Sequence, residues 1–324
     1  MTLQTRISFL ALNLLLALLL ANCSNVDVTE IPALSPTPNA TPVLTKSYAT
    51  PLPPTSTPVS VETDLLTRYG WTVIQHISSH TVTLPKSFQH HPGDFPYAIY
   101  WAYNNEFNKD IGLDLVSYLG QTVQASIYLL YEPLPAEFYP YVRAYAIVIE
   151  LDNRIIGAWI DQGRHYGFAC SLDRKNFDEI VNQEWSEWLI SAGVVDLSNE
   201  LDRELSKKTP EEIIEMYYTA MNEGDYQLYN ALRSRRALSA DLFRNKDNRA
   251  LFNHQEDEVI TRWIDNLESA TLLNIREATS GYSYVATVNF QFIDPHLVTI
   301  PEGEHSRSFY LVEEIEGLGW RINR

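Results

Sequence analysis

The sequence predicts an α+β protein with two small domains, each with helices packed on one face of a mainly antiparallel sheet. Three observations lead to this prediction. Segments whose apolar residues alternate with period two occur in both halves of the chain, and so do capped segments with apolar residues at helical spacing. Short turns join successive strands. With 324 residues, 45% hydrophobic and 12% aromatic, the chain can bury a core in each domain.

Residues 1–22 predict a signal peptide. Arg6 is the one charged side chain among them, and an apolar stretch follows from residue 7 to residue 20. That length is short for a membrane span and suits the core of an export signal. We therefore expect the mature chain to work outside the cytoplasm.

The sequence Leu20-Ala21-Asn22-Cys23 resembles the lipobox of bacterial lipoproteins. The resemblance implies that Cys23 is lipidated and becomes the mature N-terminus. The expected localisation is the extracytoplasmic face of the cell membrane, with the lipid on Cys23 as the membrane anchor. Asn22 departs from the small residue usual before the cysteine, so an ordinary secretory signal or an uncleaved anchor stays an alternative.

A proline-rich linker follows the cysteine, so that 23–61 holds the lipid attachment and the spacer. Prolines at 32, 36, 38, 42, 51, 53, 54 and 58 fix φ and remove backbone donors. Such a tract favours polyproline II and at ~3.1 Å per residue extends to about 120 Å. A spacer is the expected role, and a proline-rich ligand for a partner domain is the alternative.

The first folded domain is expected at 62–195. Helical spacing and alternation predict its elements in order: helix 62–69, strand 71–84, helix 95–110, strands 121–131, 141–151 and 155–161, and helix 176–191. Residues 196–206 are expected to link it to the second domain. Cys170 follows an apolar run and is expected to be a small buried hydrophobe.

Part of this region resembles an uncharacterised domain of Gram-positive lipoproteins, catalogued as domain of unknown function forty-eight-thirty. The resemblance covers about 62–190 and implies an extracytoplasmic location, with no known chemistry. It is carried by Tyr69-Gly70-Trp71, Gly112-Leu113-Asp114-Leu115 with Tyr118 and Gly120, Ile155-Ile156-Gly157, Gly167-Phe168 and Ser171-Leu172-Asp173.

The second folded domain is expected at 207–324. Thr209-Pro210-Glu211-Glu212 predicts a helix start, with a threonine cap, proline at the first helical position and a capping-box glutamate. This helix is expected to stop before Gly224, and Asp225 is expected to cap a second helix. An irregular stretch precedes strands at 283–293, 308–316 and 320–323.

This order resembles the nuclear-transport-factor-two-like superfamily, a cone of curved sheet wrapped on a long helix. The resemblance is carried by Tyr218, Ala220, Met221, Asn222, Gly224, Asp225, Tyr226 and Trp320-Arg321-Ile322. It implies an open-ended cone that holds a small apolar ligand. The side chains we expect to line that pocket are Tyr217, Tyr218, Met221, Trp263, Tyr284 and Phe290.

Charge and metal-ligand patterns exclude several functions. The formal net charge is −17, so binding to phosphate backbones is not expected, and no nucleic acid is predicted as a partner. His76 and His80 fall on a predicted strand, about 13 Å apart at ~3.3 Å per residue, so they cannot share an ion. His90 and His91 lie in a loop. We predict no metal, no cofactor and no catalytic residue.

A locally basic stretch stands out in the acidic chain. It consists of Arg233, Arg235, Arg236, Arg244, Lys246 and Arg249. We interpret it as a solvated loop face, with an anionic ligand or wall polymer as the alternative.

The main functional prediction is a non-enzymatic binding module for a small apolar ligand, a peptide or a cell-wall component. One alternative is an isomerase or dehydratase in the second domain, in which Tyr217 or Tyr218 converges with Asp265 or Asp294. Another is a structural or inhibitory module that docks on a protein through an apolar patch near the domain junction.

Overall fold

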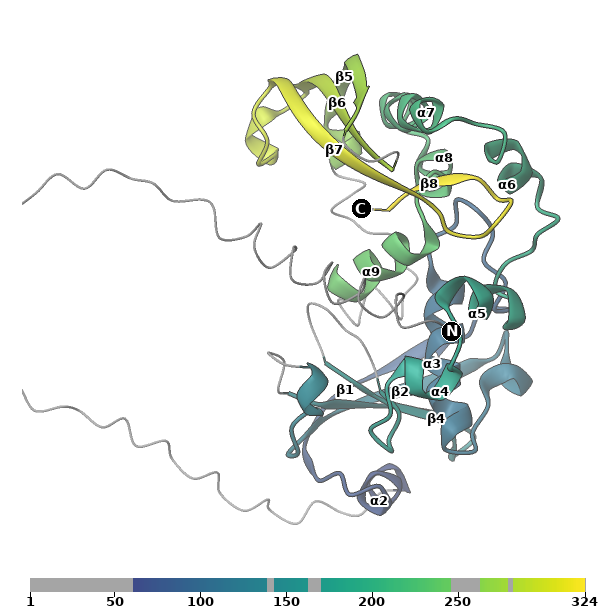
Figure 1. Ribbon diagram of the computed structural model, residues 1–324. Helices are drawn as coiled ribbons and strands as arrows, with labels where there is room; N and C mark the ends of the chain where they lie inside the picture. The colour runs from purple at the N-terminus through teal and green to yellow at the C-terminus, as the bar shows by residue number, and fades with distance from the viewer. Residues whose placement is uncertain (1–60, 139–142, 163–169, 246–262, 279–281, 324) are drawn as a thin grey trace, which may run out of the picture. The chain divides into compact units, whose positions relative to one another are not determined.

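A computed structural model of the chain describes residues 61–138, 143–162, 170–245, 263–278 and 282–323 (Figure 1). Residues 54–324 form one compact unit. The predicted signal peptide, Cys23 and most of the proline-rich linker lie outside the described residues. Within the described part of the chain, no helix combines the length and the apolar character needed to span a bilayer. The predicted fold class is confirmed, because helices accompany two four-stranded antiparallel sheets.

The first sheet has the strand order β1-β2-β3-β4. Its strands are β1 (Val73–Thr83), β2 (Thr122–Leu130), β3 (Tyr145–Leu151) and β4 (Arg154–Asp161), and each pairs antiparallel with the next. Asp152 and Asn153 form the β3–β4 turn at φ 49° and 60°. Positive φ at both positions matches the twist of a tight hairpin, and Asp and Asn tolerate it.

Both faces of the central strands β2 and β3 are buried, whereas β1 at the edge is largely exposed. One face carries Val123, Ala125 and Ile127 and packs on α3 (Tyr97–Asp110), α4 (Phe177–Val181) and α5 (Trp185–Ser191). The opposite face carries Tyr128 and Val148 and is covered in part by α2 (Val61–Arg68), through Leu65 and Leu66. Successive side chains on a strand point to opposite faces, so β2 and β3 contribute to both cores.

The helix predicted at 176–191 is two helices, so that prediction was wrong in detail. A capping box between Asn176 and Glu179 starts α4, and Asn182 ends it in the left-handed conformation at φ 49°. Asparagine adopts this conformation at low cost. The chain resumes as α5 at Trp185, and its register is therefore not continuous with that of α4.

The second sheet has the order β5-β6-β7-β8. Its strands are β5 (Leu267–Glu277), β6 (Ser283–Phe292), β7 (Gly303–Glu313) and β8 (Trp320–Ile322). The long helix α7 (Pro210–Glu223) packs against β5 and lies beside this sheet in Figure 1. Its start is as predicted: Thr209 and Glu212 form the capping box, and Gly224 ends the helix at φ 64°. The second helix, α8 (Tyr226–Ala231), is capped by Asp225.

Two elements lie in the stretch predicted to be irregular. These are α9 (Arg235–Asn245) and β5. On β5, only Ala270 is buried, so the apolar and polar residues do not alternate as they do on β6. β5 is an edge strand, and its pairing with β6 determines its conformation more than its own pattern does. Short 3₁₀ turns occur at Leu115–Tyr118, Ala136–Phe138 and Pro295–Leu297.

Residues 196–206, predicted as a linker, contain α6 (Glu200–Leu205). Asp202 on this helix is 1% exposed and accepts hydrogen bonds from Arg235 Nη2 at 2.6 Å and from Arg321 Nη2 at 2.7 Å. A single carboxylate thus bridges guanidinium groups from α9 and β8. The connection between the two sheets is therefore part of a buried charge network.

Glu314 extends this network to the first sheet's helices. Its carboxylate accepts from the backbone N–H groups of Arg235 and Arg236 at 2.9 and 2.7 Å, at the start of α9, and from Trp185 Nε1 at 3.1 Å. Just beyond it, Ile315 and Leu318 pack into the core below the first sheet. The segment between β7 and β8 thus connects the second sheet to the core of the first sheet through hydrogen bonds and apolar contacts.

The interpretation of the basic stretch as a solvated loop face was wrong for part of it. Arg233 and Arg235 are 6% and 4% exposed. Arg235 is buried because Asp202 and Glu314 compensate its charge, a partnership that a count of basic residues cannot reveal. Lys246 and Arg249 lie outside the described residues.

Candidate functional site

An aromatic cavity of about 130 Å³ lies between α7 and the second sheet. Tyr284, one of the side chains predicted to line a pocket, does not line this cavity. It is buried on the same face of β6 as Phe290. Six residues separate the two along the strand, about 20 Å at ~3.3 Å per residue, which is too far for one small cavity. The lining consists of Tyr217, Tyr218, Met221, Trp263, Phe290, Ile300, Arg307 and Phe309.

Edge-to-face ring contacts organise the wall of this cavity. The ring of Phe309 on β7 lies 5.6 Å from that of Tyr217 and 5.9 Å from that of Tyr218, centroid to centroid. Trp263 meets Phe290 edge-on at 5.6 Å. Such T-shaped pairs fix ring orientation, because the edge of one ring carries positive charge and the face of the other negative charge. The cavity therefore has a wall of interlocked rings.

Ile300, Arg307 and Phe309 were missed as lining residues. Phe309 is buried within β7, whose residues alternate between exposed and part-buried positions, and that alternation is a signal that could have found it. Arg307 places its guanidinium 5.6 Å from the centroid of the Phe290 ring. This cation–π contact brings a charged side chain to an apolar wall, which hydrophobic patterning cannot predict.

Tyr217 contributes a partly buried phenol to the cavity wall. Its hydroxyl donates to the hydroxyl of Tyr229 at 3.2 Å. Burial, and secondarily the neighbouring Tyr229, raises the pKa of Tyr217 well above its usual value of 10.0. Tyr217 therefore stays a neutral phenol at physiological pH, and it cannot act as a general base.

The described residues do not place the predicted tyrosines and aspartates in one cavity. Asp265 is exposed and accepts a short hydrogen bond from the hydroxyl of Tyr226. Asp294 accepts from the backbone N–H of His296 and starts a 3₁₀ turn. Neither carboxylate lines the aromatic cavity with Tyr217 and Tyr218. The isomerase or dehydratase alternative therefore lacks the convergent pair that it requires in this part of the chain.

The histidines singled out in the sequence occupy two separate places. His76 and His80 lie on β1, where Nε2 of each ring pairs with a serine hydroxyl at 2.9 Å. His90 and His91 lie in the loop before α3. Within the described ranges, no three His, Cys, Asp or Glu side chains are grouped closely enough to hold a metal ion.

Cys170 is fully buried, as its apolar surroundings predict. It forms an isolated bridge with Ile160 on β4. Burial raises the pKa of its thiol to about 12. The thiol is therefore protonated and unreactive at physiological pH.

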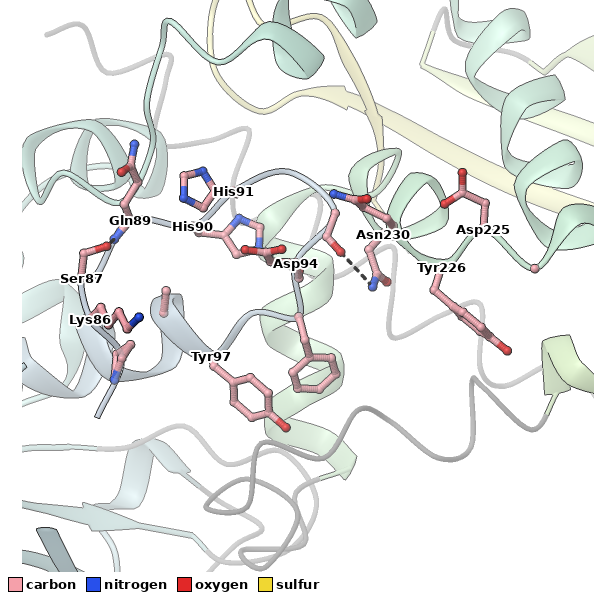
Figure 2. A pocket seen from close by; sticks show the side chains of 16 residues that line it. Lys86, Ser87, Gln89, His90, His91, Asp94, Tyr97, Asp225, Tyr226 and Asn230 are labelled. Atoms are coloured by element: carbon pink, nitrogen blue, oxygen red, sulfur yellow. Dashed lines mark hydrogen bonds between the residues drawn. The ribbon is translucent and has the colours of Figure 1, made fainter. Parts of the chain in front are cut away.

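A second and larger depression is an open polar cleft of about 890 Å³. Figure 2 shows Lys86, Ser87 and Gln89 at one end, Asn230, Asp225 and Tyr226 at the other, and the histidine loop between them. The loop leading into α3 forms one wall, and the turn from α7 into α8 forms the other. No sequence pattern pointed to this cleft, because its walls are far apart in the chain.

His90 holds the loop wall of the cleft in place. Its backbone N–H donates to Val194 O at 2.8 Å, and its Nε2 donates to Asp94 O at 3.0 Å. Burial, followed by the positive charge of Arg235, lowers the pKa of His90 from 6.5 to about 4. The ring is thus a neutral donor at physiological pH and pins the loop from inside.

Gly93 lets the two walls meet. Its φ is +91°, and a Cβ at this position would lie 2.5 Å from Cγ and 2.6 Å from the backbone O of Gln227. Only glycine adopts this conformation and allows so close an approach. Asn230 Nδ2 donates to Gly93 O at 3.4 Å and completes the contact (Figure 2).

Comparisons with known families match both folded regions. A family model described as Domain of unknown function (DUF4830) matches residues 65–160, and one described as Domain of unknown function (DUF4829) matches residues 211–324. The first match confirms the resemblance identified in the sequence. No curated protein and no solved structure matches the chain. The two folded regions are therefore similar to domains of two uncharacterised families.

Proposed function

We propose that this chain is an exported bacterial lipoprotein, anchored through Cys23, whose second sheet binds a small apolar group. The observation that carries the binding proposal is the aromatic cavity between α7 and the sheet. The leader and the lipobox-like sequence before Cys23 support the location. The binding role is non-enzymatic.

The size and lining of the cavity suit a flat or branched apolar group. Its volume is about 130 Å³. A cavity of roughly 150 Å³ lined by apolar side chains stays dry and takes up benzene. Rings held by edge-to-face contacts form much of the wall, and Arg307 and the tyrosine hydroxyls add polar groups to it. A single ring, or an apolar side chain of a peptide, is the matching ligand.

Thermal shift with small apolar probes tests this binding. Toluene, indole and cyclohexanol are added to the full chain in mild detergent. We expect at least one of them to raise the Tm, since a ligand that binds only the folded state stabilises it. If none of these probes changes the Tm, the cavity is not a binding site for small apolar groups.

A matched pair of variants locates the binding. Ile300→Phe places a ring into the lining, whereas Ile293→Phe makes the same change at a side chain that is 69% exposed outside the cavity. The first is expected to abolish the Tm increase and the second to leave it unchanged. Equal effects of the two variants would show that the probes bind elsewhere.

Replacement of Cys23 by serine tests the anchor. Mass spectrometry of the membrane-associated wild-type chain is expected to show an N-terminal lipidated cysteine. The Cys23→Ser variant is expected to lose that modification and to leave the membrane fraction. If processing and membrane retention are the same in both chains, the lipoprotein proposal is wrong.

A further inference from the structure

The polar cleft differs from the aromatic cavity in its chemistry as well as its size. It is lined by amide, carboxylate, hydroxyl and ammonium groups together with partly buried rings. The amides come from Gln89, Gln227 and Asn230, the carboxylates from Asp94 and Asp225, and the rings from Phe95, Tyr97 and Tyr226.

The charge of this lining selects against strongly charged ligands. The lining includes the ammonium group of Lys86, the carboxylates of Asp94 and Asp225, the neutral His90 and the exposed imidazole of His91. A phosphate or sulfate ester would lie near two carboxylates, and a polyamine would lie near an ammonium group. A ligand without net charge avoids both conflicts.

The polar groups suit a ligand that carries many hydroxyl groups. An amide donates and accepts, and a carboxylate accepts from two directions, so each can pair with adjacent hydroxyls. The Phe95 and Tyr97 rings lie 4.6 Å apart and are partly exposed at the start of α3. Their faces can cover the apolar C–H side of a sugar ring, which removes that surface from water.

The cleft is also built to hold its shape. His90 pins the loop through Asp94 O and Val194 O, and Gly93 packs directly on Gln227. Walls positioned by buried contacts lose little conformational entropy when a ligand binds. A volume of about 890 Å³ lies within the range of roughly 300–1,000 Å³ found for ligand sites.

We propose that this cleft is a second binding site, for a neutral oligosaccharide. Hydroxyl groups of the sugar pair with Asp94 and the amides of Gln89 and Asn230, and one sugar face stacks on Tyr97. This proposal goes beyond the apolar binding at the second sheet and depends on different residues, so each can fail without the other.

Titration of the full chain with defined sugars tests the proposal. The probes are chitotriose and maltotriose. Their binding is measured by isothermal titration calorimetry and by saturation-transfer NMR, in a detergent without a sugar head group. We expect binding of at least one trisaccharide that changes little as salt rises from about 0.05 M to about 0.5 M, because no ion pair with the ligand is involved. Failure of both sugars to bind would overturn the proposal.

Variants assign the binding to the cleft. Asp94→Ala removes an exposed carboxylate and is expected to weaken binding about ten-fold, as expected for a lost hydrogen bond to a charged group. Asp64→Ala removes an exposed carboxylate on α2 and is expected to change nothing. Tyr97→Ala is expected to weaken binding to a similar extent, with its Tm measured in parallel.

Two further outcomes would contradict the proposal. Equal binding to wild type and Asp94→Ala would place the sugar elsewhere. Binding of inorganic phosphate or spermidine that displaces the sugar and weakens with salt would identify a site for charged ligands instead. Ile300→Phe fills the aromatic cavity only and is expected to leave sugar binding unchanged, so a loss of apolar binding would not count against the cleft.

Discussion

The two sheets have the same number of strands and the same antiparallel order, but they are buried differently. In the first sheet, β2 and β3 carry buried side chains on both faces, and helices or loops cover each. In the second sheet, β6 alternates buried and part-buried residues, and Leu273 and Tyr310 are exposed on its neighbouring strands. Two-sided burial makes the central strands of the first sheet a closed scaffold, although β1 at its edge is largely exposed. The second sheet has one packed face, and the aromatic cavity lies there.

If the two sheets form one cooperative unit, loss of a buried contact near their junction destabilises both. Asp202 is the strongest point at which to test this expectation, because its carboxylate bridges Arg235 and Arg321 in the interior. Asp202→Asn keeps the shape but removes the carboxylate partner of Arg321 and leaves Arg235 with Glu314 as its acidic partner. We expect a loss of about 3–5 kcal/mol in the free energy of unfolding, measured by denaturant titration of the full chain.

Glu200→Gln is the matched control for this change. Glu200 lies on the same short helix but is exposed, so its loss of charge is expected to cost under about 0.5 kcal/mol. Tryptophan fluorescence reports mainly the first sheet and its helices, because five of the seven tryptophans lie there and Trp263 and Trp320 lie with the second core. If Asp202→Asn left this transition at the wild-type midpoint, the two sheets would unfold independently and the network would not join them.

A smaller effect is expected from acid, through His90. Its pKa is about 4 in the folded chain against 6.5 for the unfolded one, so the unfolded state binds more protons between these values. Stability is therefore lost as the pH falls from 6.5 to 4, and the loss amounts to about 3 kcal/mol once the pH is below both values. His90→Gln does not titrate and is expected to lack this contribution.

The difference in unfolding free energy between wild type and His90→Gln isolates the contribution of His90. Other groups that titrate in the same pH range contribute equally to both chains, so their contributions cancel. Unfolding free energies are measured at about pH 7, 5.5 and 4 for both chains. His91→Gln, which replaces the exposed neighbour, is expected to retain the wild-type pH dependence. An equal pH slope in wild type and His90→Gln would show that this loop is not pinned by a buried neutral imidazole.

Local signals predicted the parts of the fold that depend on local contacts. The capping box at Thr209, the left-handed Gly224 and the alternation of β6 each act within a few residues, so these features were predictable. Tyr217, Tyr218 and Met221 on α7 and Phe290 on β6 line the aromatic cavity, but the expectation of a pocket there came from a family resemblance and not from a local pattern.

Features that depend on distant partners were not predictable. Gly93 meets Gln227, and Asp202 meets Arg321, across more than a hundred residues of chain. No local sequence pattern around Gly93 or Asp202 identifies the residue that each contacts. The polar cleft and the buried charge network both arise from such pairs, and for this reason the sequence indicated neither.

The smallest predicted effect compares added bulk in the two cores. Ala146 on β3 is fully buried in the closed scaffold, so Ala146→Val is expected to cost about 1–3 kcal/mol through overpacking. Ala136→Val, at an exposed alanine, is the control for the residue change itself. Ile300→Phe adds a larger group beside an existing cavity and is expected to change stability by no more than about 0.5 kcal/mol. Denaturant titration of the three variants decides the matter. Should Ile300→Phe destabilise the chain as much as Ala146→Val does, the second core would be as tightly filled as the first, and the contrast between the sheets would not extend to their packing.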